Sequence, residues 1–278
     1  MKVLIYRIGG LGDSILTFPV IEILNKKGYE ITVWGNPEYF ILCRMAGFCN
    51  KVTFYEPKEK FDFAIVFSKN RAISGFSENS IYVEPIPEEE EWVVKWYLKK
   101  LNLLEEPFSN KLNLGLKVEK KSNLCIIHPG SGSIKKNPEK AFFIELANLI
   151  RKKGFEILFL VGPAERKTWQ VDKEIFYSDN IIEISKTLLK ASFYIGVDSG
   201  ISHLSSYLGI PSIVIFGPTN PKVWHPIGIK THLIRESSCP PCFPNTCENR
   251  KCLDKNFLIE QVINILEKNL VLEKRYLL

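Results

Sequence analysis

The sequence predicts an α/β protein whose strands form parallel sheets. One sign is the apolar strand Phe193–Val197, which ends in a polar turn and is followed by a helical run and a second apolar strand at Ile213–Phe216. This strand–turn–helix–strand order is a βαβ unit, which favours parallel pairing. The chain also opens in this way, with a strand at Val3–Ile8, a glycine-rich turn and a helix at Ser14–Lys27. Because strands and helices alternate throughout, we expect two successive α/β halves.

The first half continues with short apolar runs bounded by polar residues. They predict strands at Ile31–Trp34, Val52–Tyr55, Phe61–Phe67 and Ile81–Val83, and helices at Pro37–Ala46 and Glu88–Leu101. The polar stretch from Glu105 to Lys121 is typical of a linker. We therefore expect an N-terminal Rossmann-like domain at residues 1–118.

The second half begins again with a strand. The strands predicted here are Leu124–His128, Phe155–Val161, Phe193–Val197 and Ile213–Phe216, and the helices are Pro138–Lys153, Ala164–Tyr177, Thr187–Ala191 and Phe257–Leu270. These elements make a C-terminal Rossmann-like domain at residues 119–278. A cleft between two such domains is a preferred place for a ligand.

Composition and charge narrow the class of partner. The 278 residues are 45% hydrophobic and 24% charged, as in globular proteins. Residues 1–118 hold 15 Lys and Arg against 15 Asp and Glu, whereas residues 119–278 hold 22 against 16. The net charge of +6 therefore lies in the second half. With no aromatic-basic RNA motif present, this favours an anionic cofactor there and no nucleic-acid partner.

The sequence carries no sign of membrane insertion or export. No apolar run approaches the roughly 18 residues of a membrane span. The first strand leads into Gly-Gly-Leu-Gly-Asp rather than a signal-peptide cleavage site. We therefore expect a cytoplasmic protein, in which the seven cysteines are not structural disulfides.

The turn after Phe193–Val197 is a candidate anion site. Asp198 and Ser199 suit the N-cap of the helix that follows. Gly200 leaves space beside the first free N–H groups, and His203 lies about one turn further on. A helix N-terminus at the carboxyl end of a parallel strand attracts phosphate. The alternative is a capped helix that binds nothing.

The turn after the first strand contains Gly9, Gly10 and Gly12 and ends in Asp13. It is not a dinucleotide fingerprint, because Ile15 occupies the third glycine position, and no Gly-Lys-Ser/Thr follows as in a Walker loop. The glycines would still let a substrate approach the backbone. Asp13 either caps the first helix or acts as a general base at the mouth of the sheet.

Two further turns follow strands of the second half. In one, Gly130 and Ser131 permit close approach of a phosphate, and Lys135 or Lys136 can neutralise it, unless this is only a solvated basic loop. In the other, Glu165 can accept hydrogen bonds from ribose hydroxyls or simply favour a helix N-terminus. Hydroxyl, cation and carboxylate groups at the strand ends of one sheet indicate a nucleotide site.

Five motifs occur in order along the chain: Gly12-Asp13, His128-Pro129-Gly130-Ser131, Gly162-Pro163-Ala164-Glu165, Asp198-Ser199-Gly200-Ile201-Ser202-His203-Leu204 and Phe216-Gly217-Pro218-Thr219. This combination resembles glycosyltransferase family 9, the family of ADP-heptose:lipopolysaccharide heptosyltransferases. The resemblance implies a GT-B type fold, two Rossmann-like domains with a cleft between them. It also implies a cytoplasmic enzyme of lipopolysaccharide biosynthesis that inverts the sugar, needs no catalytic metal and holds ADP-heptose mainly in its C-terminal domain.

The resemblance also assigns roles to residues. Asp13 becomes the catalytic base, within the acceptor-side loop that holds Gly9, Gly10 and Gly12. The donor-binding residues that it implies are Gly130, Ser131, Lys135, Glu165, Asp198, Ser199, Gly200, Ile201 and His203. We expect transfer of heptose or a related sugar from a nucleotide-diphosphate donor to a glycan or lipid-linked, lipopolysaccharide-type acceptor.

Two other classes of protein fit part of the pattern. A nicotinamide-dependent Rossmann oxidoreductase would explain the glycine-rich first turn, although the missing third glycine opposes it. A non-catalytic nucleotide- or sugar-binding protein of the same fold would differ from the enzyme only in the role of Asp13.

Four cysteines, Cys239, Cys242, Cys247 and Cys252, stand within 14 residues of a proline-rich stretch. Four thiols can bind a structural zinc ion tetrahedrally, but only the first pair has the two-residue spacing of a standard zinc finger. The alternative is reduced or reversibly oxidised thiols. We expect a structural site remote from the chemistry.

The helix predicted at Glu88–Leu101 carries Trp92 and Trp96 together with Lys95 and Lys99 at helical spacing. Such a face can rest on an anionic membrane that holds a lipid-linked acceptor, and the protein would then be peripheral to the inner membrane. The simpler interpretation is a surface helix whose tryptophans belong to the core.

Overall fold

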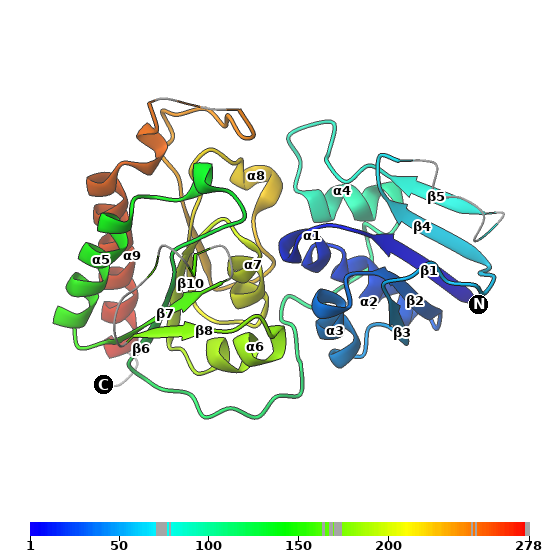
Figure 1. The fold of residues 1–278 in the computed structure, drawn as a ribbon, viewed down its shortest axis with the longest axis horizontal. Coiled ribbons are helices and arrows are strands. Elements are labelled where there is room, and N and C mark those ends of the chain that lie inside the picture. The colour runs from blue at the N-terminus through cyan, green and yellow to red at the C-terminus, as the bar shows by residue number, and fades with distance from the viewer. Residues whose placement is uncertain are drawn as a thin grey trace.

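Two parallel β-sheets, one from each half of the chain, form the framework of the protein (Figure 1). This computed structural model describes residues 1–70, 77, 79–162, 165–166, 169, 174–245, 247 and 249–275. Within them, no helix is both long and apolar enough to cross a membrane.

The first sheet has the strand order β3-β2-β1-β4-β5, and every pair in it is parallel. Its strands are β1 (Lys2–Arg7), β2 (Glu30–Gly35), β3 (Lys51–Thr53), β4 (Phe63–Phe67) and β5 (Ser80–Val83). The helices of this half are α1 (Leu11–Ile15), α2 (Phe18–Lys26), α3 (Pro37–Met45) and α4 (Val93–Lys100).

The second sheet is also fully parallel, in the order β11-β10-β9-β6-β7-β8. Its strands are β6 (Leu124–His128), β7 (Glu156–Val161), β8 (Ile175–Tyr177), β9 (Phe193–Val197), β10 (Ser212–Ile215) and β11 (Thr231–Ile234). Its helices are η1 (Ile134–Lys136), α5 (Lys140–Lys152), α6 (Ile181–Leu189), α7 (Gly200–Tyr207), α8 (Pro221–Trp224), η2 (Lys251–Leu253) and α9 (Lys255–Arg275).

Both sheets follow the doubly wound Rossmann order, in which the chain starts in the middle, winds to one edge and then returns to fill the other side. The direction of winding reverses between β1 and β4 in the first sheet and between β6 and β9 in the second. Ligands of such sheets bind at the carboxyl ends of the strands beside this reversal. We therefore expect a ligand site in the loops that follow β1, β4, β6 and β9.

Three predicted elements differ from the observed ones. The segment predicted as one helix at Ser14–Lys27 is divided between α1 and α2. Pro19 lies in the first turn of α2, where a residue needs no N–H group because the helix offers no acceptor for it. The last three residues of the helix predicted at Ala164–Tyr177 are strand β8, and residues 163–164, 167–168 and 170–173 of that region lie outside the described residues. The short helix predicted at Thr187–Ala191 is the end of the longer α6, and α8 and β11 were not predicted at all.

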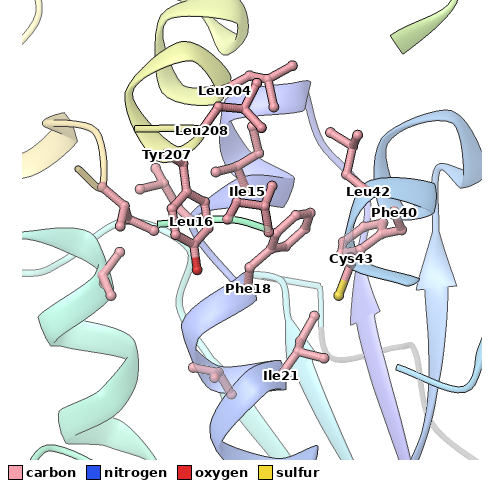
Figure 2. Close-up of a cluster of buried hydrophobic side chains, with 14 of the residues drawn as sticks. Ile15, Leu16, Phe18, Ile21, Phe40, Leu42, Cys43, Leu204, Tyr207 and Leu208 are labelled. Carbon is pink, nitrogen blue, oxygen red and sulfur yellow. The ribbon is translucent and has the colours of Figure 1, made fainter. Parts of the chain in front are cut away.

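One hydrophobic core runs through both halves of the molecule. Leu204, Tyr207 and Leu208, in and just after α7, lie against side chains of the first half that include Leu16 and Phe18 (Figure 2). The rings of Phe18 and Tyr207 have their centroids 6.5 Å apart, and both are fully buried. Because this apolar contact fixes α7 against α1 and α2, the loops that precede these helices are held together.

Candidate active site

Helices α1 and α7 touch at their N-terminal ends. A Cβ atom on Gly200 would lie 2.6 Å from Cβ of Leu11 and 3.0 Å from the backbone nitrogen of Gly12. A Cβ atom on Gly12 would lie 3.0 Å from Cδ2 of His203. Two of the predicted site glycines are thus required by the contact between the halves. The contact brings the predicted acceptor-side loop against the predicted donor-side loop.

Asp13 is the third residue of α1, and the N-cap position belongs to Gly10. Oδ2 of Asp13 accepts a hydrogen bond from the backbone N–H of Gly10 at 3.0 Å, and Oδ1 accepts one from Nη2 of Arg7 at 2.8 Å. A side chain on Gly9 would collide with this aspartate, since its Cβ would lie 2.9 Å from Cβ of Asp13. The Asp13 side chain remains 37% exposed, so the carboxylate is fixed on two sides and still open to a further partner.

A buried charged cluster lies at the start of α7. Oδ2 of Asp198 is 3.1 Å from Nζ of Lys136, and Oδ1 is 3.8 Å from Nε2 of His203. Burial raises the pKa of Asp198, but His203, the charge of Lys136 and the neighbouring Thr219 outweigh burial and lower the pKa to about 2. Asp198 is therefore ionised at neutral pH. Among the described residues, nothing pairs with the buried Nδ1 of His203.

Ser199, and not Asp198, is the N-cap of α7. Its Oγ accepts a hydrogen bond from the N–H of Ser202 at 3.3 Å. The N–H groups of Gly200 and Ile201 belong to the first turn, which an α-helix leaves without an intrahelical acceptor. Together with His203 and Lys136 they give this helix end the means to bind an anion.

The loop between β6 and α5 holds two lysines with different surroundings. Oγ of Ser131 lies 2.7 Å from Oδ1 of Asn137, so this hydroxyl holds the loop in shape. Lys135, the predicted phosphate contact, is exposed and donates to the carbonyl of Pro244 at 2.9 Å. Its neighbour Lys136 reaches Asp198 instead. The structure thus places Lys136 in the charged cluster and Lys135 beside it.

Glu165 and Gly130 form one packed unit at the ends of β7 and β6. Glu165 is 7% exposed, and its Oε2 accepts the N–H of Gly162 at 3.0 Å. A Cβ atom on Gly130 would lie 2.0 Å from Oε1 of Glu165. His128 lies nearby, where burial lowers its pKa although its contact with Leu160 and the charge of Glu165 act in the opposite sense. Any larger residue at position 130 would therefore collide with the Glu165 carboxylate.

The four-cysteine segment, residues 239–252, lies on the donor-side loops. The backbone N–H groups of Cys242 and Phe243 donate to the carbonyl of Pro218 at 2.9 and 3.1 Å. Nζ of Lys136 is 5.6 Å from the centroid of the Phe243 ring. The backbone at Cys242 and Phe243 thus lies near Lys136, and the expectation that the four cysteines form a structural site remote from the chemistry stays a prediction.

The thiols of this segment are close enough to influence one another. Burial raises the pKa of Cys252 to about 11, and the nearby Cys239, Cys242 and Cys247 add to this rise. In the described part of the chain, however, no group of three or more His, Cys, Asp or Glu side chains is arranged to hold a metal ion.

The tryptophans of α4 and its N-cap point into the protein. Trp96 is 4% exposed, and its indole N–H donates to the carbonyl of Glu84 at 2.9 Å. Trp92 stacks on His225 with ring centroids 4.4 Å apart and donates to the His225 carbonyl at 2.9 Å. These tryptophans thus belong to the interior, and Trp92 joins the first half to the second.

Sequence patterns did not single out Arg7 as a site residue. The available signal was its position, since it is a charged residue in the otherwise apolar strand predicted at Val3–Ile8. A buried charge needs a partner, and the nearest acidic residue along the chain is Asp13. The sequence could not show which of Lys135 and Lys136 contacts Asp198, because side chains in an irregular loop follow no regular alternation of direction.

The model of glycosyltransferase family 9 (heptosyltransferase) matches residues 88–253, which is more than half of the chain. The chain belongs to glycosyltransferase family 9. The resemblance seen in the five sequence motifs is therefore confirmed.

Two curated relatives belong to lipopolysaccharide and lipooligosaccharide synthesis by name. Lipopolysaccharide heptosyltransferase 1 of Pseudomonas aeruginosa is 27% identical over 145 residues, 47% of this chain and 41% of that protein. Lipooligosaccharide heptosyltransferase 2 of Campylobacter jejuni is 27% identical over 198 residues, 63% of this chain and 60% of that protein. The chain thus matches less than two thirds of the length of either relative.

Solved structures confirm the fold over nearly the whole chain. A family 9 glycosyltransferase from Veillonella parvula has a TM-score of 0.74 at 17% identity and covers 97% of both chains. Heptosyltransferase WaaC of E. coli with ADP has a TM-score of 0.69 at 15% identity, with 97% of this chain and 100% of that chain covered. The dodecameric, iron-containing heptosyltransferase TibC with ADP-D-beta-D-heptose has a TM-score of 0.70 at 15% identity, with 97% and 76% covered. The predicted GT-B type fold is correct.

Proposed function

We propose that this protein is an inverting glycosyltransferase that moves heptose, or a related sugar, from ADP-heptose to a hydroxyl of a lipopolysaccharide-type glycan. The observation that carries the proposal is the contact between α1 and α7, in which Gly12, the residue before the partly exposed Asp13, lies against His203 of the charged cluster. A base on one side and an anion-binding helix end on the other are the two groups that such a transfer needs. The names of the two relatives support the substrate class.

The donor diphosphate would bind at the N-terminus of α7. The free N–H groups of the first turn lie at this helix end, and Lys136 and His203 lie on either oxygen of Asp198, the residue before the N-cap. Glu165 is buried in the loop after β7, two strands from β9 in the same sheet, where its carboxylate can accept hydrogen bonds from ribose hydroxyls. The adenine nucleotide bound to WaaC supports an ADP-linked donor.

The reaction then follows from these positions. The acceptor oxygen attacks the anomeric carbon from the face opposite the diphosphate, and its proton passes to Asp13. The bond between the anomeric carbon and the diphosphate oxygen breaks, and its electron pair leaves with the nucleotide. General base catalysis of this kind contributes about 10²–10⁴-fold. The charge that grows on the leaving diphosphate is stabilised by the α7 N-terminus, Lys136 and His203, so the proposed reaction needs no catalytic metal.

The two alternative classes find less support. The side chain of Ile15, at the third glycine position of a dinucleotide fingerprint, is fully buried in the core, which leaves no close approach for a pyrophosphate there. In a non-catalytic binding protein the bonds of Asp13 to Gly10 and Arg7 would serve only the structure of the first turn, so the measurement of sugar transfer separates that class from the enzyme.

The proposal is tested in two stages. Thermal shift with a panel of sugar nucleotides and NAD identifies the ligand, since a compound at 100 times its dissociation constant stabilises by about 2.7 kcal/mol. We expect ADP-heptose to shift the melting temperature and NAD to have no effect. Mass spectrometry should then detect heptose added to a truncated lipopolysaccharide acceptor, with ADP released. Stabilisation by NAD, or donor binding without transfer to any core glycan, would contradict the proposal.

We also propose that the four-cysteine segment holds a structural zinc ion. Four thiols lie within 14 residues and within electrostatic reach of one another. The description of TibC as iron-containing makes iron the competing metal. Metal analysis of protein purified under reducing conditions, without chelator, should find about one zinc per chain. Iron in its place corrects the identity of the metal, and absence of both contradicts the proposal.

We further propose a cytoplasmic location, with the protein at the inner membrane only while its lipid-linked acceptor is there. The inward tryptophans of α4 offer no membrane-binding face, so the acceptor itself would supply the attachment. Fractionation of cells with and without the acceptor glycan tests this. Membrane association that persists without acceptor would contradict it.

A further inference from the structure

Arg7 is a buried cation at the carboxyl end of β1. The residue is 6% exposed, and Val3, Leu4 and Ile5 on the same strand are fully buried. A guanidinium is rarely placed in such surroundings unless a partner fixes it, because the unpaired charge would be costly. Its partners therefore indicate what it is there to do.

Those partners lie on both sides of the point where the first sheet reverses its winding. Nη2 of Arg7 donates to Oδ1 of Asp13 at 2.8 Å, and Nη1 donates to the carbonyl of Phe67, the last residue of β4, at 3.3 Å. The other carboxylate oxygen of Asp13 accepts the N–H of Gly10 at 3.0 Å. Asp13 is thus held at Oδ1 by a cation anchored to a neighbouring strand and at Oδ2 by its own turn.

We propose that Arg7 is a positioning residue that holds the Asp13 carboxylate correctly oriented for the acceptor hydroxyl. The inference rests on the proposed function, in which Asp13 is the base. A general base must be deprotonated before the reaction and aimed at the proton that it takes. A planar guanidinium that bonds Phe67 through one nitrogen and Asp13 through another limits rotation of the carboxylate. Arg7 touches neither substrate and acts through Asp13.

A purely structural role makes a different prediction. If Arg7 served only to join β1 to β4, its removal would weaken the protein equally whether residue 13 were Asp or Asn. If it acts through the carboxylate, its removal matters for transfer only while that carboxylate is present. A double-mutant cycle separates these cases, since residues that act as one unit are non-additive.

The test compares Arg7→Met, Arg7→Lys, Asp13→Asn and the double variant Arg7→Met/Asp13→Asn, with Lys2→Met as the matched control. Lys2 begins the same strand but its side chain is 50% exposed and away from Asp13. Transfer rates, donor KM and urea unfolding are measured for each protein.

We expect Arg7→Met to lower kcat by about 10²-fold, as for a misplaced catalytic group, while donor KM and ADP affinity stay within about twofold. Arg7→Lys should recover part of the rate, Lys2→Met should leave it unchanged, and Arg7→Met should cause no further loss when Asp13 is already Asn. A wild-type rate in Arg7→Met, or equal further loss in the double variant, would overturn the inference.

Two controls keep the outcomes apart. If Arg7→Met does not fold, Arg7→Lys decides, because it keeps the charge but replaces the planar group and its two bonding nitrogens with a single nitrogen on a flexible chain. A wild-type kcat there would overturn the inference. If the wild-type protein transfers no sugar, the proposed function fails, and the coupling between Arg7 and Asp13 in urea unfolding still shows whether they act as a pair. Additive unfolding energies would then overturn the inference on its own.

Discussion

Replacing Gly130 by alanine should weaken nucleotide binding without unfolding the protein. The new Cβ would lie 2.0, 2.2 and 2.3 Å from Oε1, Cδ and Cγ of Glu165, far inside van der Waals contact. All three atoms belong to the Glu165 side chain and none to the backbone, so the new methyl group would displace that side chain. Gly130→Ala is therefore a way to displace Glu165 without changing its identity.

The size of the effect follows from the role proposed for Glu165. A hydrogen bond to a charged group contributes about 1.5–3 kcal/mol, which corresponds to roughly 10–150-fold in the dissociation constant. Glu165 is 7% exposed and already bonded to the N–H of Gly162, so no other orientation keeps its carboxylate in place. We expect ADP to bind to Gly130→Ala weaker by this factor, and Glu165→Gln to show a similar loss.

Isothermal titration calorimetry with ADP measures the effect, and Gly132→Ala is the matched control. Gly132 lies two residues further along the same loop, and a Cβ there would meet no atom within 4 Å. The control should bind ADP as the wild type does. Gly130→Ala that is folded and binds ADP with unchanged affinity would refute the reasoning, and so would an equal loss in Gly132→Ala.

Three further predictions concern α7 and its cluster. Gly200→Ala should destabilise by about 1–3 kcal/mol in urea unfolding, because its Cβ would lie 2.6 Å from Cβ of Leu11; unchanged stability would mean that the two helices do not touch. Folding lowers the pKa of Asp198 from 3.8 to about 2, so the ionised group contributes about 2 kcal/mol of stability. That contribution is complete above about pH 5 and is lost as the pH falls toward 2, so Asp198→Asn should flatten the acid side of the stability–pH curve, and parallel curves would exclude the effect. His203→Ala should weaken ADP binding by about 1.5–3 kcal/mol in calorimetry, and unchanged affinity would remove His203 from the site.

Local patterns in the sequence predicted most of the sheets. Buried parallel strands such as β6 and β9 are continuous apolar runs, and the turns after them contain the glycine and polar residues that such positions need. Strand β8 was predicted as the end of a helix, although its residues Ile175–Tyr177 favour strands, because a run of three residues is too short to show an alternating pattern. Its pairing with β7, which no local pattern records, makes it a strand.

The parts of the site that depend on contacts far along the chain could not be predicted in the same way. The glycine turn suggested close approach of a substrate, whereas Gly12 is small because His203, 191 positions later, lies against it. The path of the proline-rich cysteine segment is set by its hydrogen bonds to Pro218 and by the bond from Lys135 to Pro244, which no local pattern records. Residue types and spacing identified the candidate groups, and tertiary packing determines which of them meet.

The most direct test of the central claim is the transfer rate of Asp13→Asn, measured beside its ADP affinity and its stability. Asparagine keeps an oxygen that can accept from Arg7 or Gly10, but it cannot take up the acceptor proton. We predict a variant that folds and binds ADP as the wild type does, while heptose transfer falls by about 10²-fold or more. Transfer at the wild-type rate would show that Asp13 is not the base, and a variant that unfolds would show that the residue serves the structure of the first turn.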